Sequence, residues 1–307
     1  MDDDVTTPAP QPLVPDTGPP AVVAALDGSA HEDAVVAWAA AAAARHGVRL
    51  DLVHVVEVGV SLTSYDMLVS EAPRFGEQLE AAARDRLGAV AAQVRDRYDG
   101  LEVEIHTPVG SPPAVLVAMS EHATVVLGAV SQSRLHRLVL GSTALAVVAH
   151  SHGTVVVVPE AMPPVQPHRV VVGADGSEPG ARALAYAVAE AAAAGGTVTV
   201  VTAWTVEVDD GIVVTEPGPR AQRVEERLLE STRAAREAAQ AQHPEVPVEV
   251  VVRRGRAADT LLGVADEIGA DLVVLGSRGR GGFAGLLLGS VSRTVVQQAK
   301  TPVAVIR

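Results

Sequence analysis

A glycine-rich segment near the end of the chain has the residue types and spacing of an anion site. Two residues separate Gly276 from Gly279, and nine more lead to the pair Gly289-Ser290. Glycine lets the backbone approach a phosphate closely, because no Cβ intrudes, and successive N–H groups can then point into one concave site. Gly289-Ser290 opens the next expected helix, whose first N–H groups are unpaired. The segment therefore predicts a phosphate-binding loop.

Polar side chains in the same segment add to this prediction. Ser290 and Ser292 offer hydroxyl donors, and Arg278 and Arg280 offer positive charge for the outer phosphates. The alternative for the two arginines is a solvated loop position, which is the commoner one. A dinucleotide-binding motif over 279–284 is disfavoured, because it would follow a late strand with no acidic ribose partner after it.

This loop belongs to the second of two copies of one sequence unit. Asp27 in VVAALDGS and Asp175 in VVVGADGS lie 148 positions apart (175 − 27). The same shift relates three further pairs: Gly128 with Gly276, Gly141 with Gly289, and Ser142 with Ser290. One shift that holds along both halves indicates a duplicated domain. We expect a leader over 1–20, a first domain over 21–160, a proline-rich linker over 161–168 and a second domain over 169–307.

Short valine-rich runs alternate with longer alanine-rich segments in each copy, which predicts βαβ units and parallel strands buried on both faces. The expected strands are 21–26, 49–57, 101–107, 123–128 and 154–158, then 169–174, 197–204, 247–253, 271–276 and 302–306. Ser29 and Glu32 predict a capping box for the first helix, and Ser177 and Gly195 a start and a stop in the second copy. The fold class is α/β, with two tandem doubly wound, Rossmann-like domains of the HUP type. Each has a five-stranded, mainly parallel sheet with helices on both faces, and such sheets bind ligands beyond the carboxyl ends of their strands.

The glycine spacing, Asp175 after a first strand, the DLVVLG strand and the final TPVAVI strand together resemble the ATP-binding universal stress proteins. The resemblance covers both domains. It implies ATP as the ligand, with magnesium as an optional companion of the phosphates, although the sequence shows no preformed carboxylate cage. In the second domain it implies a site made of Asp175, Ala203, Gly276, Gly279, Gly289, Ser290, Val291 and Ser292, to which the charge argument above adds Arg278 and Arg280. Asp175 would hold the ribose or base end, and its alternative is a simple Asp-Gly turn that caps a helix.

The first domain departs from this pattern. Ser131 and Ala144 stand where the second domain has Gly279 and Ser292. A non-glycine residue costs roughly 1–2 kcal/mol where a left-handed backbone is required. The counterpart site residues are Asp27, Val55, Gly128, Gly141 and Ser142, and we expect weak or absent nucleotide binding there. His54 is either a pocket residue or a packed strand end.

Composition narrows the kinds of metal site, binding partner and cellular location that are expected. The chain has no cysteine and a formal net charge of −13, which argues against cysteine-ligated metals and against nucleic-acid or acidic-membrane partners. His150 and His152 have no third ligand in sight, so no metal site is predicted. The first residues lack a basic start and an apolar run, so we expect a disordered leader and a cytoplasmic protein.

The leading functional prediction is a non-enzymatic, or at most slowly hydrolysing, ATP-dependent stress or signalling module, since no nucleophile–base pair is visible. The alternatives are a nucleotide-independent interaction module with a vestigial site, a cyclic AMP binder, and an adenylyl-transfer or flavin enzyme. The resemblance also implies that the closing strands of the two copies pair. It leaves open a homodimer or an unidentified protein partner.

Overall fold

The computed structural model of the chain describes residues 20–29, 32–57, 65–132, 137–159, 166–205, 207–209, 212–214, 218–280 and 287–307. Nearly all of the expected leader, most of the expected linker and the pair Gly281-Gly282 lie outside these residues.

The first domain alternates strands and helices along the chain. Its elements are β1 (Ala21–Ala25), α1 (Glu32–His46), β2 (Arg49–Val53), α2 (Tyr65–Arg97), β3 (Val103–His106), α3 (Pro112–Met119), β4 (Ala123–Gln132), β5 (Arg137–Val139), α4 (Ser142–His150) and β6 (Val155–Pro159). The five predicted strands are all present as β1, β2, β3, β4 and β6. Strand β4 runs beyond its predicted end at residue 128, and β5 was not predicted.

The second domain repeats the order. Its elements are β7 (Arg169–Gly173), α5 (Glu178–Ala194), β8 (Thr197–Trp204), β9 (Glu207–Asp209), β10 (Ile212–Val214), α6 (Pro219–Gln240), β11 (Val248–Arg254), α7 (Ala257–Ile268), β12 (Leu272–Gly276), α8 (Ser290–Gln298) and β13 (Val303–Ile306). The predicted strands are again present, within about one residue at either end. The small antiparallel pair β9–β10 is an addition that the sequence analysis missed.

Each domain is a doubly wound parallel sheet, as predicted. The strand order is β3-β2-β1-β4-β6 in the first domain and β11-β8-β7-β12-β13 in the second. All pairs within each of these paths are parallel. The order reverses between β1 and β4, and likewise between β7 and β12, so a crevice opens at the carboxyl ends of those strands.

The closing strands join the two sheets into one. Strand β13 pairs antiparallel with β6, with Val303 opposite Val157 and Val305 opposite Val155. This confirms the pairing that the family resemblance implied, and it occurs within a single chain. Including β5, the strands form one sheet of 11 strands among the described residues.

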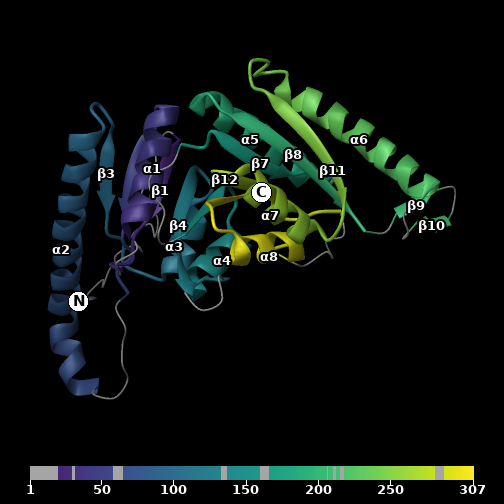
Figure 1. Cartoon of the computed structure of the whole chain (residues 1–307). Coiled ribbons are helices and arrows are strands. Elements are labelled where there is room, and N and C mark those ends of the chain that lie inside the picture. The colour runs from purple at the N-terminus through teal and green to yellow at the C-terminus, as the bar shows by residue number, and fades with distance from the viewer. Residues whose placement is uncertain are drawn as a thin grey trace, which may run out of the picture.

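Alternating strand residues build a core on each face of this sheet. On one face, Val22, Val156 and Ala304 pack with helices α1, α2, α5 and α6. On the other, Val23, Val155 and Val303 pack with α3, α4, α7 and α8. Figure 1 shows α2 and α6 at opposite ends of the assembly. Both cores continue across β6 and β13, so the two domains share their hydrophobic interior.

A buried ion cluster also fastens α1 to α5. Arg45 donates from Nη2 to Glu190 Oε2 at 2.6 Å, and His46 Nε2 lies 2.8 Å from Glu190 Oε1. The side chains of Arg45 and Glu190 are 5% and 3% exposed. Burial alone would raise the pKa of Glu190, but the contacts with His46 and Arg45 outweigh it and hold that pKa below its ordinary value.

The local helix signals were right in the second domain and wrong in the first. Ser177 caps α5 by accepting the N–H of Gly180, and Gly195 ends that helix in the left-handed region at φ 62°. In the first domain Glu32 accepts the N–H of Gly28 instead of that of Ser29, whose amide bonds to Asp27 Oδ1 at 2.9 Å. The half of the predicted capping box in which Glu32 accepts the N–H of Ser29 therefore does not form.

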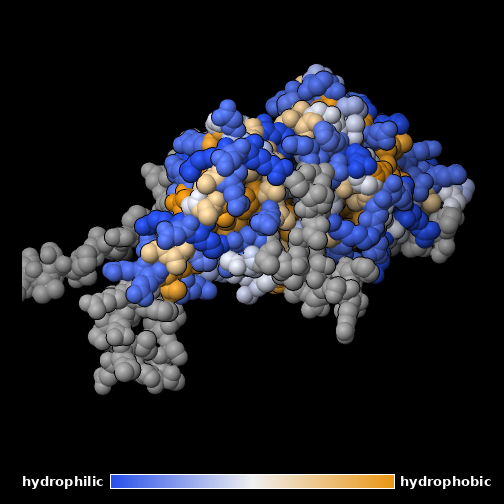
Figure 2. Space-filling view, turned by 60° about the vertical axis from the view of Figure 1, so that its left-hand side comes forward, coloured by the Kyte–Doolittle hydropathy of each residue, from blue (hydrophilic) through white to orange (hydrophobic). Residues whose placement is uncertain are grey.

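The outer surface is mostly hydrophilic on the face that can be seen in Figure 2. Hydrophobic side chains are exposed on this face in smaller areas among the hydrophilic ones. Within the described ranges, no helix has the length and apolar character needed to cross a membrane.

Candidate functional site

The second domain holds a cavity of about 500 Å³ beyond the carboxyl ends of β7, β8 and β12. This is the edge where a doubly wound sheet binds ligands. All ten residues predicted for this domain line it: Asp175, Ala203, Gly276, Arg278, Gly279, Arg280, Gly289, Ser290, Val291 and Ser292. The walls are completed by apolar residues that include Val201, Leu261 and Leu275. The residues predicted from the sequence for this domain therefore all line a single cavity.

Asp175 organises the turn that follows β7. Its Oδ1 accepts the N–H of Ser177 at 3.0 Å and the Ser177 hydroxyl at 2.6 Å. Its Oδ2 accepts the N–H of Arg280 at 2.9 Å, from the loop that follows β12. The carboxylate therefore ties two loops together across the crevice. The turn-and-cap alternative considered for Asp175 describes part of its role, and the side chain still faces the cavity.

Two glycines let those loops come close. A Cβ on Gly279 would collide with Asp175 Oδ2, and a Cβ on Gly276 would lie 2.7 Å from the Pro179 carbonyl carbon at the start of α5. Real Cβ atoms essentially never approach backbone so closely. The glycine spacing thus has a physical basis that does not depend on any ligand. Within this loop the N–H groups of Ser277 and Arg280 bond to Ile306 O and Asp175 Oδ2. Among the described residues of the loop, the N–H groups of Arg278 and Gly279 are therefore the ones left for a ligand.

Helix α8 begins at this loop and faces the cavity with its first turn. The N–H of Gly289 bonds to Ser277 O at 2.8 Å, which closes the loop. Ser292 is 3% exposed and donates its hydroxyl to Gly276 O at 2.8 Å. Its hydrogen is thus used inside the protein, which corrects the prediction that Ser292 donates to a phosphate. Ser290 is exposed, so its hydroxyl can still serve as a donor.

Arg278 and Arg280 carry the positive charge of this cavity. Both are exposed at its mouth. In the part of the chain that the structure describes, neither guanidinium has a carboxylate within ion-pair distance. Burial and the nearby charge of Arg278 hold the pKa of Arg307 below its ordinary value. Val291, also at the cavity, is an exposed large hydrophobic side chain at 38%.

The first domain has a cavity at the equivalent edge, of about 330 Å³. All five residues predicted there line it: Asp27, Val55, Gly128, Gly141 and Ser142. His54 lines it too, and its Nδ1 lies 2.8 Å from Leu26 O. In the second domain the equivalent contact is made by Thr202, whose hydroxyl donates to Ala174 O at 2.9 Å. Both interpretations of His54 therefore hold, because it packs at a strand end and faces the cavity.

Sequence analysis missed Glu32 as a cavity residue. Its side chain lines the first cavity at 14% exposure and forms an ion pair with Arg86 of α2. The signal was present in the repeat, because the shift of 148 aligns Glu32 with Gly180. A Cβ on Gly180 would lie 2.8 Å from Asp175 Oδ1, so the second domain has no room for a side chain at that position.

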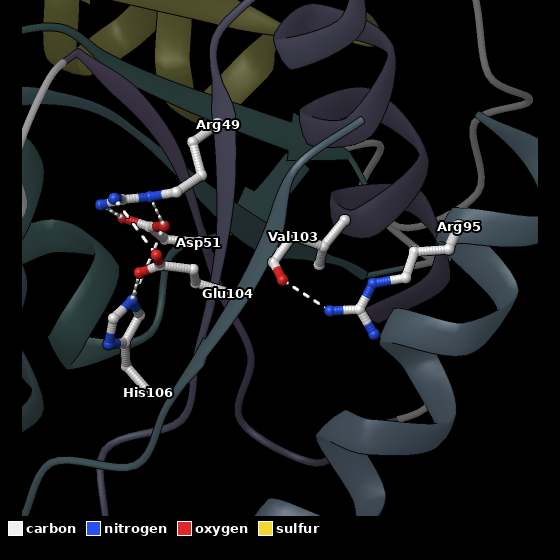
Figure 3. Close-up of polar contacts among 6 residues, drawn as sticks. All are labelled: Arg49, Asp51, Arg95, Val103, Glu104 and His106. Carbon is white, nitrogen blue, oxygen red and sulfur yellow. Dashed lines mark hydrogen bonds and ion pairs between the residues drawn. The ribbon is translucent and has the colours of Figure 1, made fainter. Parts of the chain in front are cut away.

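A second missed group lies at the edge of the first domain, on β2 and β3. Asp51, Glu104 and His106 bring potential metal-ligating atoms within 4.8 Å of one another. Arg49 already occupies both oxygens of Asp51, from Nε at 2.7 Å and Nη2 at 3.1 Å (Figure 3). Burial would raise the pKa of the fully buried Asp51, but His106 and Arg49 outweigh it and lower that pKa. The group is best described as an internally compensated ion network.

The chain was also compared with known proteins. A family model described as "Universal stress protein family" matches residues 20–159 and 167–307. A universal stress protein of Mycolicibacterium smegmatis is 34% identical over 291 residues, covering 93% of this chain and 96% of the relative. One from Mycobacterium tuberculosis is 34% identical over 294 residues, with the same coverage. The crystal structure of a universal stress protein from Archaeoglobus fulgidus has a TM-score of 0.64 at 22% identity, over 94% of this chain and 96% of that one.

Proposed function

The chain belongs to the universal stress protein family, with two tandem domains, and on this premise we propose that its second domain binds ATP. Nucleotide binding would stabilise that domain and shift its association with a partner, as expected of a stress-response or signalling module. The observation that carries the proposal is the presence, at one cavity, of a Cβ-excluding backbone loop and two arginines that have no acidic partner among the described residues.

Each part of ATP has a matching part of the cavity. The adenine ring suits the apolar wall formed by Val201, Ala203 and Leu261. The triphosphate suits the backbone of Arg278 and Gly279, the first turn of α8 and the guanidinium groups of Arg278 and Arg280. The ribose would lie between them, beside Asp175. That carboxylate already accepts three hydrogen bonds, so it has about one acceptor position left for a hydroxyl.

The described lining residues offer little for catalysis. Asp175 is the sole carboxylate among them, and it is engaged with both loops. A magnesium ion would thus be held mainly by the phosphates and water. The proposal is accordingly one of binding, with hydrolysis at most slow.

The test is calorimetric titration of the full chain with ATP and magnesium, alongside Gly279→Ala and Gly263→Ala. Gly263 lies within α7 and has open space where a Cβ would be, so its alanine variant is a matched control. We expect about one ATP per chain at the second cavity, at least tenfold weaker binding in Gly279→Ala, and no change in Gly263→Ala.

Cyclic AMP is titrated in parallel, because two arginines alone do not distinguish a ligand with one phosphate from a ligand with three. Tighter binding of cyclic AMP than of ATP would replace the proposed ligand. No binding of either compound at millimolar concentration, in protein freed of retained nucleotide, would contradict the proposal and favour a nucleotide-independent interaction module.

A further inference from the structure

The first cavity has the opposite charge balance from the second. Three carboxylates line it, those of Asp27, Glu32 and Glu57, and none of its described lining residues is a lysine or an arginine. The second cavity has two arginines beside a single carboxylate. Charges of one sign around a concave, low-dielectric site reinforce one another in their effect on a ligand. A phosphate that enters the first cavity therefore meets repulsion where one entering the second meets attraction.

Glu32 is an anion built into the first cavity. Its Oε1 accepts the N–H of Gly28, in the turn after β1, and its Oε2 pairs with Arg86. The protein's own carboxylate thus accepts a backbone N–H of this turn and pairs with the Arg86 guanidinium, while its side chain lines the cavity.

The backbone that would hold phosphates is also used differently in the two domains. In the second domain β12 ends at Gly276, and a loop follows. In the first, β4 continues to Gln132 and pairs antiparallel with β5, with Val130, Ser131 and Gln132 opposite Val139, Leu138 and Arg137. Residues 130–132 are the counterparts of 278–280. Their peptide groups belong to a β-ladder, so they do not form a concave anion site.

The part of the first cavity that suits a flat ring is retained. Its apolar wall comprises Leu26, Val53, Val55, Leu116 and Leu127. Carboxylates and a serine hydroxyl, those of Asp27, Glu57 and Ser142, lie among these apolar residues in the same lining. Ionised carboxylates are acceptors only, which suits hydroxyl and amino donors on a ligand. The cavity is also smaller than the second, at about 330 Å³ against about 500 Å³.

We propose that the first cavity binds an unphosphorylated purine nucleoside, so that the two domains of one chain bind different forms of the same compound. The apolar wall holds the base, and the carboxylates of Asp27 and Glu57 accept hydrogen bonds from the ribose hydroxyls. The acidic lining and the β4–β5 ladder exclude nucleotides. The identity of the base rests on the proposed function, because it is inferred from the equivalence of the two cavities. The preference against phosphate rests on the first cavity alone.

The experiment titrates the full chain with adenosine, AMP and ATP in a matched pair of variants. Ala203→Phe fills the ring-binding wall of the second cavity, and Val55→Phe fills the equivalent wall of the first. In the Ala203→Phe chain we expect one adenosine per chain and at least tenfold weaker binding of AMP. In the Val55→Phe chain this adenosine site should be lost while ATP binding persists. Thermal melting of both variants verifies that they fold.

A separate variant tests whether the Glu32 carboxylate disfavours a phosphate in the first cavity. Glu32→Gln, in the Ala203→Phe background, should strengthen AMP binding about tenfold and change adenosine binding little, as expected for removing one charge near a phosphate. Asp33→Asn removes the same charge from the next residue of α1. Asp33 is exposed and outside the cavity lining, so this control should leave the ratio of adenosine to AMP affinity unchanged.

Three results would overturn the inference. All three concern the Ala203→Phe chain. In the first, AMP or ATP binds as tightly as adenosine; in the second, none of these compounds binds. In the third, the chain binds only an organic cation such as agmatine. The proposed function fails separately, if the Val55→Phe chain does not bind ATP. Adenosine binding by the first cavity could then still be observed.

Discussion

Strands β4 and β12 occupy equivalent places in the two domains but end differently. Their shared part belongs to the common fold, and the residues that follow it differ between the two cavities. Up to Gly128 and Gly276 the two strands are equivalent, with the same neighbours and the same parallel register. Beyond that point β4 forms a hairpin with β5, whereas the 277–280 segment forms a loop anchored on Asp175. The comparison teaches that the two domains keep the same strands and helices while the segment after one strand differs, and it is this segment that borders the proposed ATP site.

The largest effect is expected where the domains meet. Glu190 stands where the first domain has Ala42, and it compensates Arg45 and His46. Glu190→Ala would leave the buried Arg45 without its counter-ion, which typically costs about 3–5 kcal/mol. Chemical denaturation should show this loss. The reverse substitution, Ala42→Glu, puts a carboxylate at a buried position of the core and should also destabilise the chain. An unchanged midpoint for Glu190→Ala would show that the cluster contributes little.

The pH dependence of stability should show the same cluster. The pKa of folded Glu190 lies below its ordinary value of 4.5. The stabilisation from this group is therefore complete above that ordinary value and is lost as pH falls through the lower folded pKa. Melting curves between pH 7 and pH 3 should show a shallower acid limb for Glu190→Gln than for the unmodified chain. Identical acid limbs would contradict this assignment.

The charge difference between the two cavities can also be reduced by removing the positive charges of the second cavity. Arg278→Ala combined with Arg280→Ala removes both positive charges from the second cavity. We expect ATP binding to weaken about 10- to 100-fold, with adenosine affected much less, because only the phosphates lose partners. Competition binding measures both ligands in one assay. Arg254→Ala, at an exposed arginine outside the cavity lining, serves as the control. Equal weakening of ATP and adenosine would indicate a structural effect.

A smaller effect is expected at the start of α8. Ser292→Ala removes the hydrogen bond to Gly276 O and reproduces Ala144 of the first domain. The carbonyl of Gly276 would lose that partner, at a cost of about 1 kcal/mol. Thermal unfolding should register this loss, together with a modest rise in the Kd for ATP. The reciprocal Ala144→Ser is the matched variant, and stabilisation by both substitutions would be inconsistent with this role.

No gain of ATP binding is expected from Ser131→Gly alone. Ser131 lies in the β4–β5 ladder opposite Leu138, so a glycine there leaves the backbone paired. The measurement is the number of ATP molecules bound per chain, which should stay near one. A second equivalent would show that one side chain controls the difference between the two cavities and that the ladder does not.

The fold was predictable because its signals are repeated and local. The shift that relates Asp27 to Asp175 recurs along both halves, and valine runs identify strands buried on both faces. The second cavity was predictable for a similar reason. Gly276 and Gly279 are required by close contacts with Pro179 and Asp175, and such requirements appear in a sequence as glycine at fixed spacing.

What could not be predicted depends on how polar groups pair in three dimensions. Ser292 looks like a phosphate donor by residue type, but its hydroxyl bonds to Gly276 O. Glu32 has the spacing of a capping box, but it accepts from Gly28 and pairs with Arg86, 54 residues away. The β4–β5 hairpin was missed because Ser131 was assessed as a loop residue, although Val130 and Val139 can extend a ladder.

The cluster of Arg45, His46 and Glu190 has a consequence for symmetry. In a dimer of two identical domains related by a twofold axis, every residue at the interface is repeated on the other side. A glutamate on one helix would then be accompanied by the same glutamate on its mate, and an arginine by an arginine. A twofold interface could carry such a Glu–Arg pair only in two copies, one on each side of the axis. Because both domains here lie in one chain, α1 supplies Arg45 and His46 and α5 supplies a single Glu190. The ion cluster therefore favours association of the first domain with the second over association of two copies of either one.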